Sequence, residues 1–238
     1  MSYLRAQGIE GLVVLGGDGS LAGAWKLHEL GMPTVTVPGT IDNDIPGTEI
    51  SIGADTAINT AMEAIDRLRD TASAHQRAMV VEVMGRRSGY IAVMAGIATG
   101  AEMIITPERP PELEDVFAEI RRNAERGKRH FIIVVAEGAR WSAEELTRLI
   151  NDAPHIFDYE ARYTVLGYIQ RGGAPSRFDR ILATRMGVAA AEALLEGRSG
   201  VLVCWSNNGV VVRDADRLEP QPDPWDAALD QVHRITAL

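Results

Sequence analysis

Short runs of consecutive Val, Ile and Leu alternate along this chain with longer segments in which apolar residues recur every three or four positions. The apolar runs are typical of β-strands that are covered on both faces, and they lie at residues 12–15, 34–37, 79–83, 103–106, 131–135, 163–166, 201–205 and 210–212. The helical spacing predicts helices at 20–30, 54–69, 111–126, 142–152, 177–196 and 224–235. Such alternation predicts an α/β fold with mainly parallel sheets and right-handed crossovers.

The beginning of the chain differs from this pattern. Residues 1–10 resemble the end of a helix, and a buried strand follows at once. We therefore interpret the chain as N-terminally truncated. The closing helical segment, in contrast, reads as a complete end.

Composition narrows the possible functions. The 238 residues include 24 Lys and Arg and 33 Asp and Glu, which gives a net charge of −9 and disfavours nucleic-acid binding. The single cysteine, Cys204, fits a reducing cytoplasm and a small buried side chain. The start shows no signal peptide, and no apolar run reaches the ~20 residues of a membrane span. His75 and His130 lack partners at zinc-ligand spacing.

The first candidate site is the run Gly16-Gly17-Asp18-Gly19-Ser20, between a predicted strand and a predicted helix. Glycines allow phosphate oxygens to approach the backbone, and a helix N-terminus offers unpaired N–H groups and a positive dipole. Asp18 can hold Mg²⁺ directly or through water. A tight turn with an N-terminal capping residue would explain the same pattern.

A second loop contains two acids. Pro38-Gly39-Thr40-Ile41-Asp42-Asn43-Asp44 follows the next predicted strand, and the carboxyl ends of parallel strands form the ligand crevice of such sheets. A carboxylate beside an alcohol can take its proton while a phosphoryl group arrives. The pattern alone also fits an ordinary turn stabilised by Asp and Asn side chains.

Further polar groups follow other predicted strands. Met84-Gly85-Arg86-Arg87-Ser88-Gly89, Glu137-Gly138 and Leu166-Gly167-Tyr168-Ile169-Gln170-Arg171-Gly172-Gly173 each come after an apolar run. Arg86 and Arg171 can bind phosphate, and Glu137 can accept hydrogen bonds from sugar hydroxyls. Arg77 and Arg162 are further candidates. All of these are equally compatible with solvated surface charges.

Taken together, these motifs resemble the 6-phosphofructokinases of glycolysis. The segments Gly16–Ser20, 38–44, 84–89, 136–138 and 166–173 match the family in order, and so does Ala64-Ile65-Asp66-Arg67-Leu68-Arg69-Asp70-Thr71. The resemblance covers essentially the whole chain. It implies phosphoryl transfer from ATP to the 1-hydroxyl of fructose 6-phosphate, with Mg²⁺, in a cytoplasmic and allosterically regulated homo-oligomer, either a dimer or a homotetramer.

The resemblance also assigns roles to individual residues. Asp42 matches the general base, Asp44 its companion acid, Thr40 a residue that places the reacting groups, and Arg86 an arginine near the transferred phosphoryl group. Gly17, Asp18, Gly19 and Ser20 match the nucleotide site, with Asp18 as the Mg²⁺-associated acid. Met84, Gly85 and Glu137 match sugar contacts, Tyr168 and Arg171 match contacts to the 6-phosphate, and Arg77 and Arg162 match arginines that reach this phosphate from a neighbouring subunit. Arg69, Glu102, Arg126 and Lys128 match effector-site positions.

By the same resemblance the chain forms two doubly wound lobes. Residues 1–53 with 166–216 would form an incomplete nucleotide-binding lobe, and residues 54–165 with 217–238 a lobe for the sugar phosphate. Gly19 and Gly39 stand where pyrophosphate-using relatives typically carry Asp and Lys, which indicates ATP as the donor. Tyr168 departs from the His usual in bacterial members, and it cannot become cationic near neutral pH.

Two alternatives stay open from the sequence. The family's N-terminal units, with the first glycine-rich loop and an arginine that bridges both substrates, have no counterpart here. The resemblance therefore implies a sheet that lacks inner strands and exposes a strand edge and apolar surface, so we expect a tendency to aggregate. For the same reason the chain could be an inactive fragment that binds only nucleotide or a partner subunit. NAD kinases and lipid kinases also use a Gly-Gly-Asp-Gly turn, although the acids at 42 and 44 and the cluster around Arg171 favour a sugar-phosphate kinase.

Overall fold

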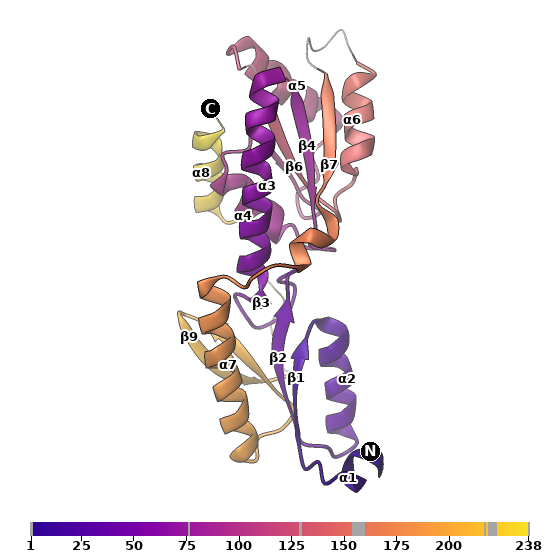
Figure 1. Cartoon of the computed structure of the whole chain (residues 1–238), viewed down its shortest axis with the longest axis vertical. Helices are drawn as coiled ribbons and strands as arrows, with labels where there is room; N and C mark the ends of the chain where they lie inside the picture. The colour runs from indigo at the N-terminus through magenta and orange to yellow at the C-terminus, as the bar shows by residue number, and fades with distance from the viewer. Residues whose placement is uncertain are drawn as a thin grey trace. The chain divides into compact units, whose positions relative to one another are not determined.

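The chain folds into two compact units, which Figure 1 shows as separate groups of helices and strands. The computed structural model describes residues 2–75, 77–128, 130–153, 160–216, 218 and 223–237. Unit 1 comprises Met1–Asp55 and Pro175–Pro222, and unit 2 comprises Thr56–Ala174 and Asp223–Leu238.

Unit 1 is built on a five-stranded sheet. Its strands β1, β2, β8 and β9 follow each other in that order across the sheet, and β3 pairs with one end of β2. All pairs are parallel except the hairpin of β8 and β9. The elements are α1 (Ser2–Ala6), β1 (Leu12–Gly16), α2 (Asp18–Glu29), β2 (Thr34–Thr40), β3 (Ile52–Gly53), α7 (Arg177–Leu195), β8 (Val201–Ser206) and β9 (Gly209–Asp214).

Helices α2 and α7 cover opposite faces of this sheet (Figure 1). Alternation along β2 explains the arrangement, because Val35 and Val37 join the core beneath α7, whereas the Thr34 hydroxyl on the other face donates to the Ala24 carbonyl of α2 at 3.3 Å. β1 lies at the end of the strand order. Its side chains Val13 and Leu15 are 45% and 60% exposed, which agrees with the exposed edge expected from the sequence.

Unit 2 contains a four-stranded, entirely parallel sheet in the order β5, β6, β4, β7. Its elements are α3 (Ala54–His75), β4 (Ala78–Val83), α4 (Tyr90–Ala98), β5 (Met103–Ile105), α5 (Leu113–Glu125), β6 (Phe131–Ala136), α6 (Ala143–Asn151), β7 (Ala161–Val165), the 3₁₀ helix η1 (Gly167–Arg171) and α8 (Ala227–Thr236). One face carries α5 and α6, which bury residues such as Ile120 and Leu146 against Val80 and Ile133. α4 packs on β5 and β6.

The alternation of strands and helices expected from the sequence is confirmed, with differences at the ends of elements. α3 continues to His75, six residues beyond the expected end, because the apolar stripe that includes the buried Ile65 extends to Ala72. α8 begins only at Ala227, since the Asp226 side chain caps the helix by accepting the Leu229 N–H at 2.7 Å. The short strand β3 and η1 were not predicted, because two to five residues carry no measurable periodicity.

The compact units divide the chain at other residues than the predicted lobes, whose binding roles stay predictions. Residues 54, 55 and 218, which were predicted in the sugar-phosphate lobe, belong to unit 1. Residues 166–174, which the sequence boundaries placed with the nucleotide-binding lobe, belong to unit 2. The reason is local hydrogen bonding, since the Leu166 N–H donates to the Glu82 carbonyl at 3.0 Å. No helix among the described residues has the length and apolar character required to cross a membrane.

Candidate active site

The glycine-rich loop at 16–20 lies at the carboxyl end of β1 and opens directly into α2. Gly17 is the N-cap residue of α2 and has extended backbone angles. The Gly19 N–H donates to Asp18 Oδ1 at 2.8 Å, so the acid is held at the helix N-terminus. A Cβ atom added at Gly19 would meet no atom within 4 Å. The loop therefore presents exposed backbone and a carboxylate at the positive end of a helix dipole.

The second loop lies beside the first. β1 and β2 are parallel and in register, with Gly16 opposite Pro38, so both loops emerge at the same sheet edge. A Cβ atom added at Gly17 would lie 3.5 Å from Thr40 Cβ. The Thr40 hydroxyl accepts the Asp42 N–H at 3.3 Å. The two motifs that the sequence placed on one edge are thus neighbours, with room for little more than a methyl group between Gly17 and Thr40.

Asn43 supports the turn that carries the two acids. It has a left-handed backbone conformation with φ of 50°, which Asn tolerates better than most residues. Its amide donates to the Glu49 carbonyl at 3.1 Å and accepts the Ser51 N–H at 2.8 Å. The Ser51 hydroxyl in turn donates to the Thr40 carbonyl at 2.7 Å. Asn43 was known from the sequence only as the residue between two acids, and its bracing role was missed.

Asp42 itself is 5% exposed, whereas Asp44 is partly buried. The acid proposed as a base is therefore largely shielded from solvent. A shielded carboxylate interacts more strongly with nearby charges and hydrogen-bond donors than one in bulk water.

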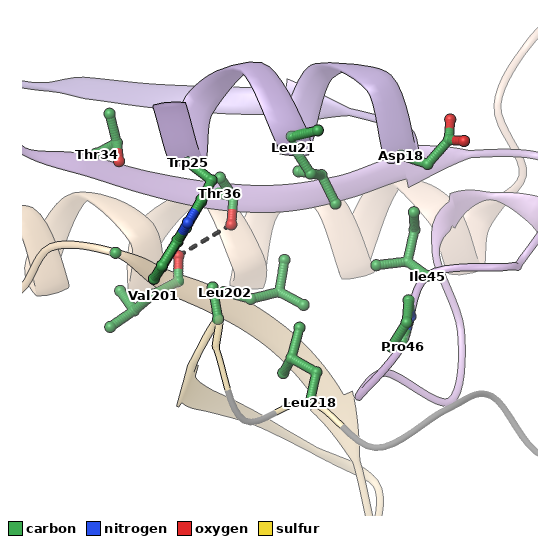
Figure 2. A pocket seen from close by; sticks show the side chains of 13 residues that line it. Asp18, Leu21, Trp25, Thr34, Thr36, Ile45, Pro46, Val201, Leu202 and Leu218 are labelled. Atoms are coloured by element: carbon green, nitrogen blue, oxygen red, sulfur yellow. Dashed lines mark hydrogen bonds between the residues drawn. The ribbon is translucent and has the colours of Figure 1, made fainter. Parts of the chain in front are cut away.

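An apolar pocket of about 250 Å³ lies in unit 1 on the α2 face of the sheet. Figure 2 shows Leu21 and Trp25 of α2 on one side and Leu202 and Leu218 on the other, with the Asp18 carboxylate pointing away at one end. The Thr36 hydroxyl is already used, because it donates to the Val201 carbonyl at 2.9 Å. Such walls suit an apolar group and not a phosphate.

In unit 2, three loop segments begin at the same edge of the parallel sheet, where three strands end. They follow β4, β6 and β7 and contain residues 84–89, 137–138 and 166–171. The Arg86 N–H donates to Glu137 Oε1 at 2.5 Å, and the Gly89 N–H donates to Glu108 Oε1 at 2.8 Å. The Met84 N–H donates to the side-chain carbonyl of Gln170 at 2.9 Å. Neither Glu108 nor Gln170 was predicted as a site residue. Glu108 stands in none of the motifs, and Gln170 lies within the motif at 166–173 but was assigned no role.

The loop at 84–89 has an unusual backbone. Gly85 has φ of 147°, and Arg86 has φ of 53° in the left-handed region. The Arg86 carbonyl approaches Gly138 so closely that a Cβ atom there would lie 2.0 Å from the oxygen. Arg86 and Arg87 are exposed in this loop, and a left-handed non-glycine residue is more common at functional sites than elsewhere.

The remaining candidates for contacts to the 6-phosphate form two pairs. The Arg171 guanidinium lies 5.3 Å from the centre of the Tyr168 ring, so these two residues of η1 are together as expected. Arg77 lies directly before β4 and Arg162 lies on the neighbouring strand β7, and both pair with Glu160, at 3.2 Å and 2.5 Å respectively. All four side chains lie in unit 2, whereas the residues at 17–20 and 40–44 lie in unit 1.

The residues matched to an effector site also gather in unit 2. Lys128 Nζ lies 3.1 Å from Glu102 and donates to the Ala237 carbonyl at 2.8 Å. Glu102 and Arg126 contribute to the lining of a cavity of about 360 Å³. Arg69 donates to the Thr99 carbonyl at 2.5 Å, which ties its side chain to the end of α4.

Two further expectations concern Mg²⁺ binding and the single cysteine. Among the described residues no group of three or more His, Cys, Asp or Glu side chains forms a metal cluster. Mg²⁺ usually takes only one or two protein carboxylates together with substrate phosphates and water, so the single carboxylate of Asp18 is compatible with it. Cys204 is buried, as expected, and burial raises the pKa of its thiol to about 11.

Comparison with known proteins decides which family this geometry represents. The family model described as Phosphofructokinase matches residues 1–194. The chain belongs to the phosphofructokinase family. It is 54% identical over 214 residues to the ATP-dependent 6-phosphofructokinases of Bacillus cytotoxicus and Halalkalibacterium halodurans, which covers 90% of this chain. The chain spans 66% of the length of these curated relatives.

The fold comparison agrees with this family. A solved phosphofructokinase of Pichia pastoris superposes with a TM-score of 0.82 and 35% identity, covering 99% of this chain and 27% of that one. These matches favour the phosphofructokinase interpretation over an NAD or lipid kinase. They also agree with the α/β fold of mainly parallel sheets that the sequence predicted.

Proposed function

We propose that this chain carries the phosphoryl-transfer site of an ATP-dependent 6-phosphofructokinase, which converts fructose 6-phosphate to fructose 1,6-bisphosphate in glycolysis. One observation carries the proposal. The glycine-rich loop and the Asp42 turn emerge from neighbouring parallel strands in register, and a Cβ atom added at Gly17 would already lie 3.5 Å from Thr40 Cβ. A phosphate held by the first loop would therefore lie next to the acids of the second.

On the donor side, Gly17, Gly19 and Ser20 would bind the phosphates of ATP through backbone N–H groups at the start of α2. Asp18 would hold Mg²⁺, which when bound neutralises charge on the transferred phosphoryl group. Two glycines support ATP over pyrophosphate as the donor. Both stand where pyrophosphate-using relatives typically carry Asp and Lys, and space is open above Gly19, while a Cβ atom at Gly39 would require the exposed Leu15 side chain to move, its Cδ1 lying 2.7 Å away.

At the acceptor, Asp42 would take the proton from the 1-hydroxyl as that oxygen attacks the γ-phosphorus of ATP. Asp44 would keep negative charge near the base, and Thr40 would orient the turn through its bond to the Asp42 N–H. Arg86 would stabilise the charge on the transferred phosphoryl group. The pair of electrons on the hydroxyl oxygen forms the new P–O bond, and the electrons of the broken bond remain on ADP.

The sugar-phosphate side would be formed by unit 2. Met84, Gly85 and Glu137 would contact the sugar, and Tyr168 with Arg171 would bind the 6-phosphate. Arg77 and Arg162 would reach the 6-phosphate of a neighbouring subunit, so the active assembly would be a homo-oligomer, either a dimer or a tetramer. This assembly would be cytoplasmic, with effectors bound near Arg69, Glu102, Arg126 and Lys128. Unit 1 would serve the nucleotide and unit 2 the sugar phosphate, so residues 166–174 count here with the sugar-phosphate side and not with the nucleotide-binding lobe.

The test is a direct assay of the 238-residue chain with ATP, Mg²⁺ and fructose 6-phosphate, in which fructose 1,6-bisphosphate is measured. Replacing Asp42 by Ser should reduce turnover by about 10²–10⁴-fold while substrate binding is retained. Asp214→Ser changes an exposed acid of the same unit and should leave turnover unchanged. Equal turnover in wild type and D42S would refute the assignment. NAD and diacylglycerol as acceptors test the other kinase classes.

One observation supports a second candidate, an inactive fragment that binds nucleotide or a partner subunit. The chain spans only 66% of the length of its curated relatives. This alternative predicts ATP binding by calorimetry without product formation, and activity that returns when a longer chain supplies the remainder. Turnover by the 238-residue chain alone would exclude it.

A further inference from the structure

Gln170 is a buried amide at the edge of the sugar-phosphate side of unit 2. It belongs to η1, directly before Arg171, and its side chain is 1% exposed. Its carbonyl oxygen accepts the Met84 N–H at 2.9 Å. This bond fixes which end of the amide faces the loop, and the Nε2 group is then left buried without a hydrogen-bond partner among the described residues.

A buried N–H₂ group without a partner is unfavourable, so the position calls for an explanation. The other two supports of the 84–89 loop come from Glu137 and Glu108, which follow β6 and β5. Gln170 differs because it connects this loop to the segment that carries Tyr168 and Arg171. Its single accepted hydrogen bond spans 86 residues of sequence.

We propose that Gln170 is a positioning residue that holds the backbone at Met84–Gly85 in a fixed relation to the η1 side chains Tyr168 and Arg171. The inference rests on the proposed function, because these two segments would contact the sugar and its 6-phosphate respectively. A ligand that must touch both segments binds tightly only when their separation is already set. Gln170 touches no substrate in this scheme and acts through Met84.

The experiment compares three variants of the 238-residue chain. Gln170→Met keeps the length of the side chain and removes the acceptor, whereas Gln170→Glu keeps an acceptor oxygen for the Met84 N–H. Asn123→Leu is the matched control, because Asn123 is likewise a buried amide of unit 2, 1% exposed, with one unpaired atom. It bonds within α5 and not to the loop. Hydrogen exchange is followed in peptides that contain residues 84–89 and 167–171.

We expect Gln170→Met to accelerate exchange of the Met84 amide about tenfold, the factor for loss of one hydrogen bond. Gln170→Glu should restore protection, and Asn123→Leu should leave the loop unchanged. Unchanged exchange at 84–89 in Gln170→Met would overturn the proposal. Fructose 6-phosphate binding, measured by calorimetry, should weaken about tenfold in Gln170→Met at constant ATP affinity.

The two readouts separate the inference from the proposed function. Faster exchange with an unaltered fructose 6-phosphate affinity would overturn the link between Gln170 and the sugar phosphate. If the wild-type chain binds no fructose 6-phosphate at all, the proposed function fails. The exchange comparison still decides in that case whether Gln170 holds the two segments together.

Discussion

A Cβ atom at Gly138 would lie 2.0 Å from the carbonyl oxygen of Arg86. The contact joins the end of β6 to the left-handed residue of the 84–89 loop, and only a glycine allows it. We expect Gly138→Ala to lower the free energy of unfolding of unit 2 by about 1–3 kcal/mol, since either backbone must shift. Urea denaturation followed by circular dichroism measures the change.

A matched glycine shows the opposite behaviour. Gly187 lies inside α7, and a Cβ atom there would meet nothing within 4 Å. Gly187→Ala should raise stability by about 0.5–1 kcal/mol through the higher helix propensity of Ala. If Gly138→Ala were as well tolerated as Gly187→Ala, the close approach to Arg86 would be refuted.

The turn with the two acids should depend on Asn43. Asn43→Ala loses an amide that binds Glu49 and Ser51 and places Ala at a positive φ. The strain costs about 1–2 kcal/mol and the orphaned buried Ser51 N–H about 1–3 kcal/mol, so we expect a loss of about 3 kcal/mol. Thermal or urea unfolding provides the measurement.

Asn208 offers the control for Asn43. It has φ of 60° but lies in the exposed turn between β8 and β9. Asn208→Ala should therefore cost only the strain, about 1 kcal/mol. A similar loss in both variants would mean that the side-chain hydrogen bonds of Asn43 contribute nothing.

The loops that carry Asp18 and Asp42 show what sequence patterns can and cannot predict. The strand runs placed Asp18 and Asp42 at one sheet edge, because parallel strands in register bring their following loops together. Asn43, Glu108 and Gln170 were missed, since each acts by a hydrogen bond to backbone that is distant in sequence or around a turn. No local period reports such a bond. The end of α3 was likewise underestimated, because tertiary burial of Ala72 extends the helix beyond its strongest pattern.

Tyr168 allows a pH-dependent test of the proposed phosphate contact. Tyr168 is 79% exposed and packs on Arg171. In Tyr168→His, imidazole with an ordinary pKa near 6.5 becomes cationic as pH falls. We expect this variant to bind fructose 6-phosphate about threefold to fivefold more tightly at pH 6 than at pH 8, an exposed pair being worth about 1 kcal/mol or less.

Wild type and Tyr168→Phe are the controls for the tighter binding expected of Tyr168→His at pH 6. Neither side chain gains charge in this range, so their affinities for fructose 6-phosphate should vary much less between pH 6 and 8 than that of Tyr168→His. Calorimetric titration at the two pH values decides the matter. If the affinity of Tyr168→His for fructose 6-phosphate did not change with pH, the proposed contact between residue 168 and the 6-phosphate would be refuted.

Cys204 should resist alkylation in the folded chain. Burial raises the pKa of its thiol from 9.0 to about 11, which lowers the reactive thiolate fraction at pH 8 by about 100-fold. Reaction with iodoacetamide should therefore be slow at pH 8 and accelerate as pH rises toward 11. In urea the rate should return to that of an ordinary thiol. Equal rates in the native and unfolded chain would contradict the burial of this side chain.

The support of the Asp42 turn comes from Thr40, Asn43 and Ser51, whose side chains carry no charge. None of these hydrogen bonds depends on a side chain that titrates with the carboxylates. With Asp42 as the proposed base, a proton can therefore arrive and leave there once per reaction cycle while these hydrogen bonds of the turn stay intact.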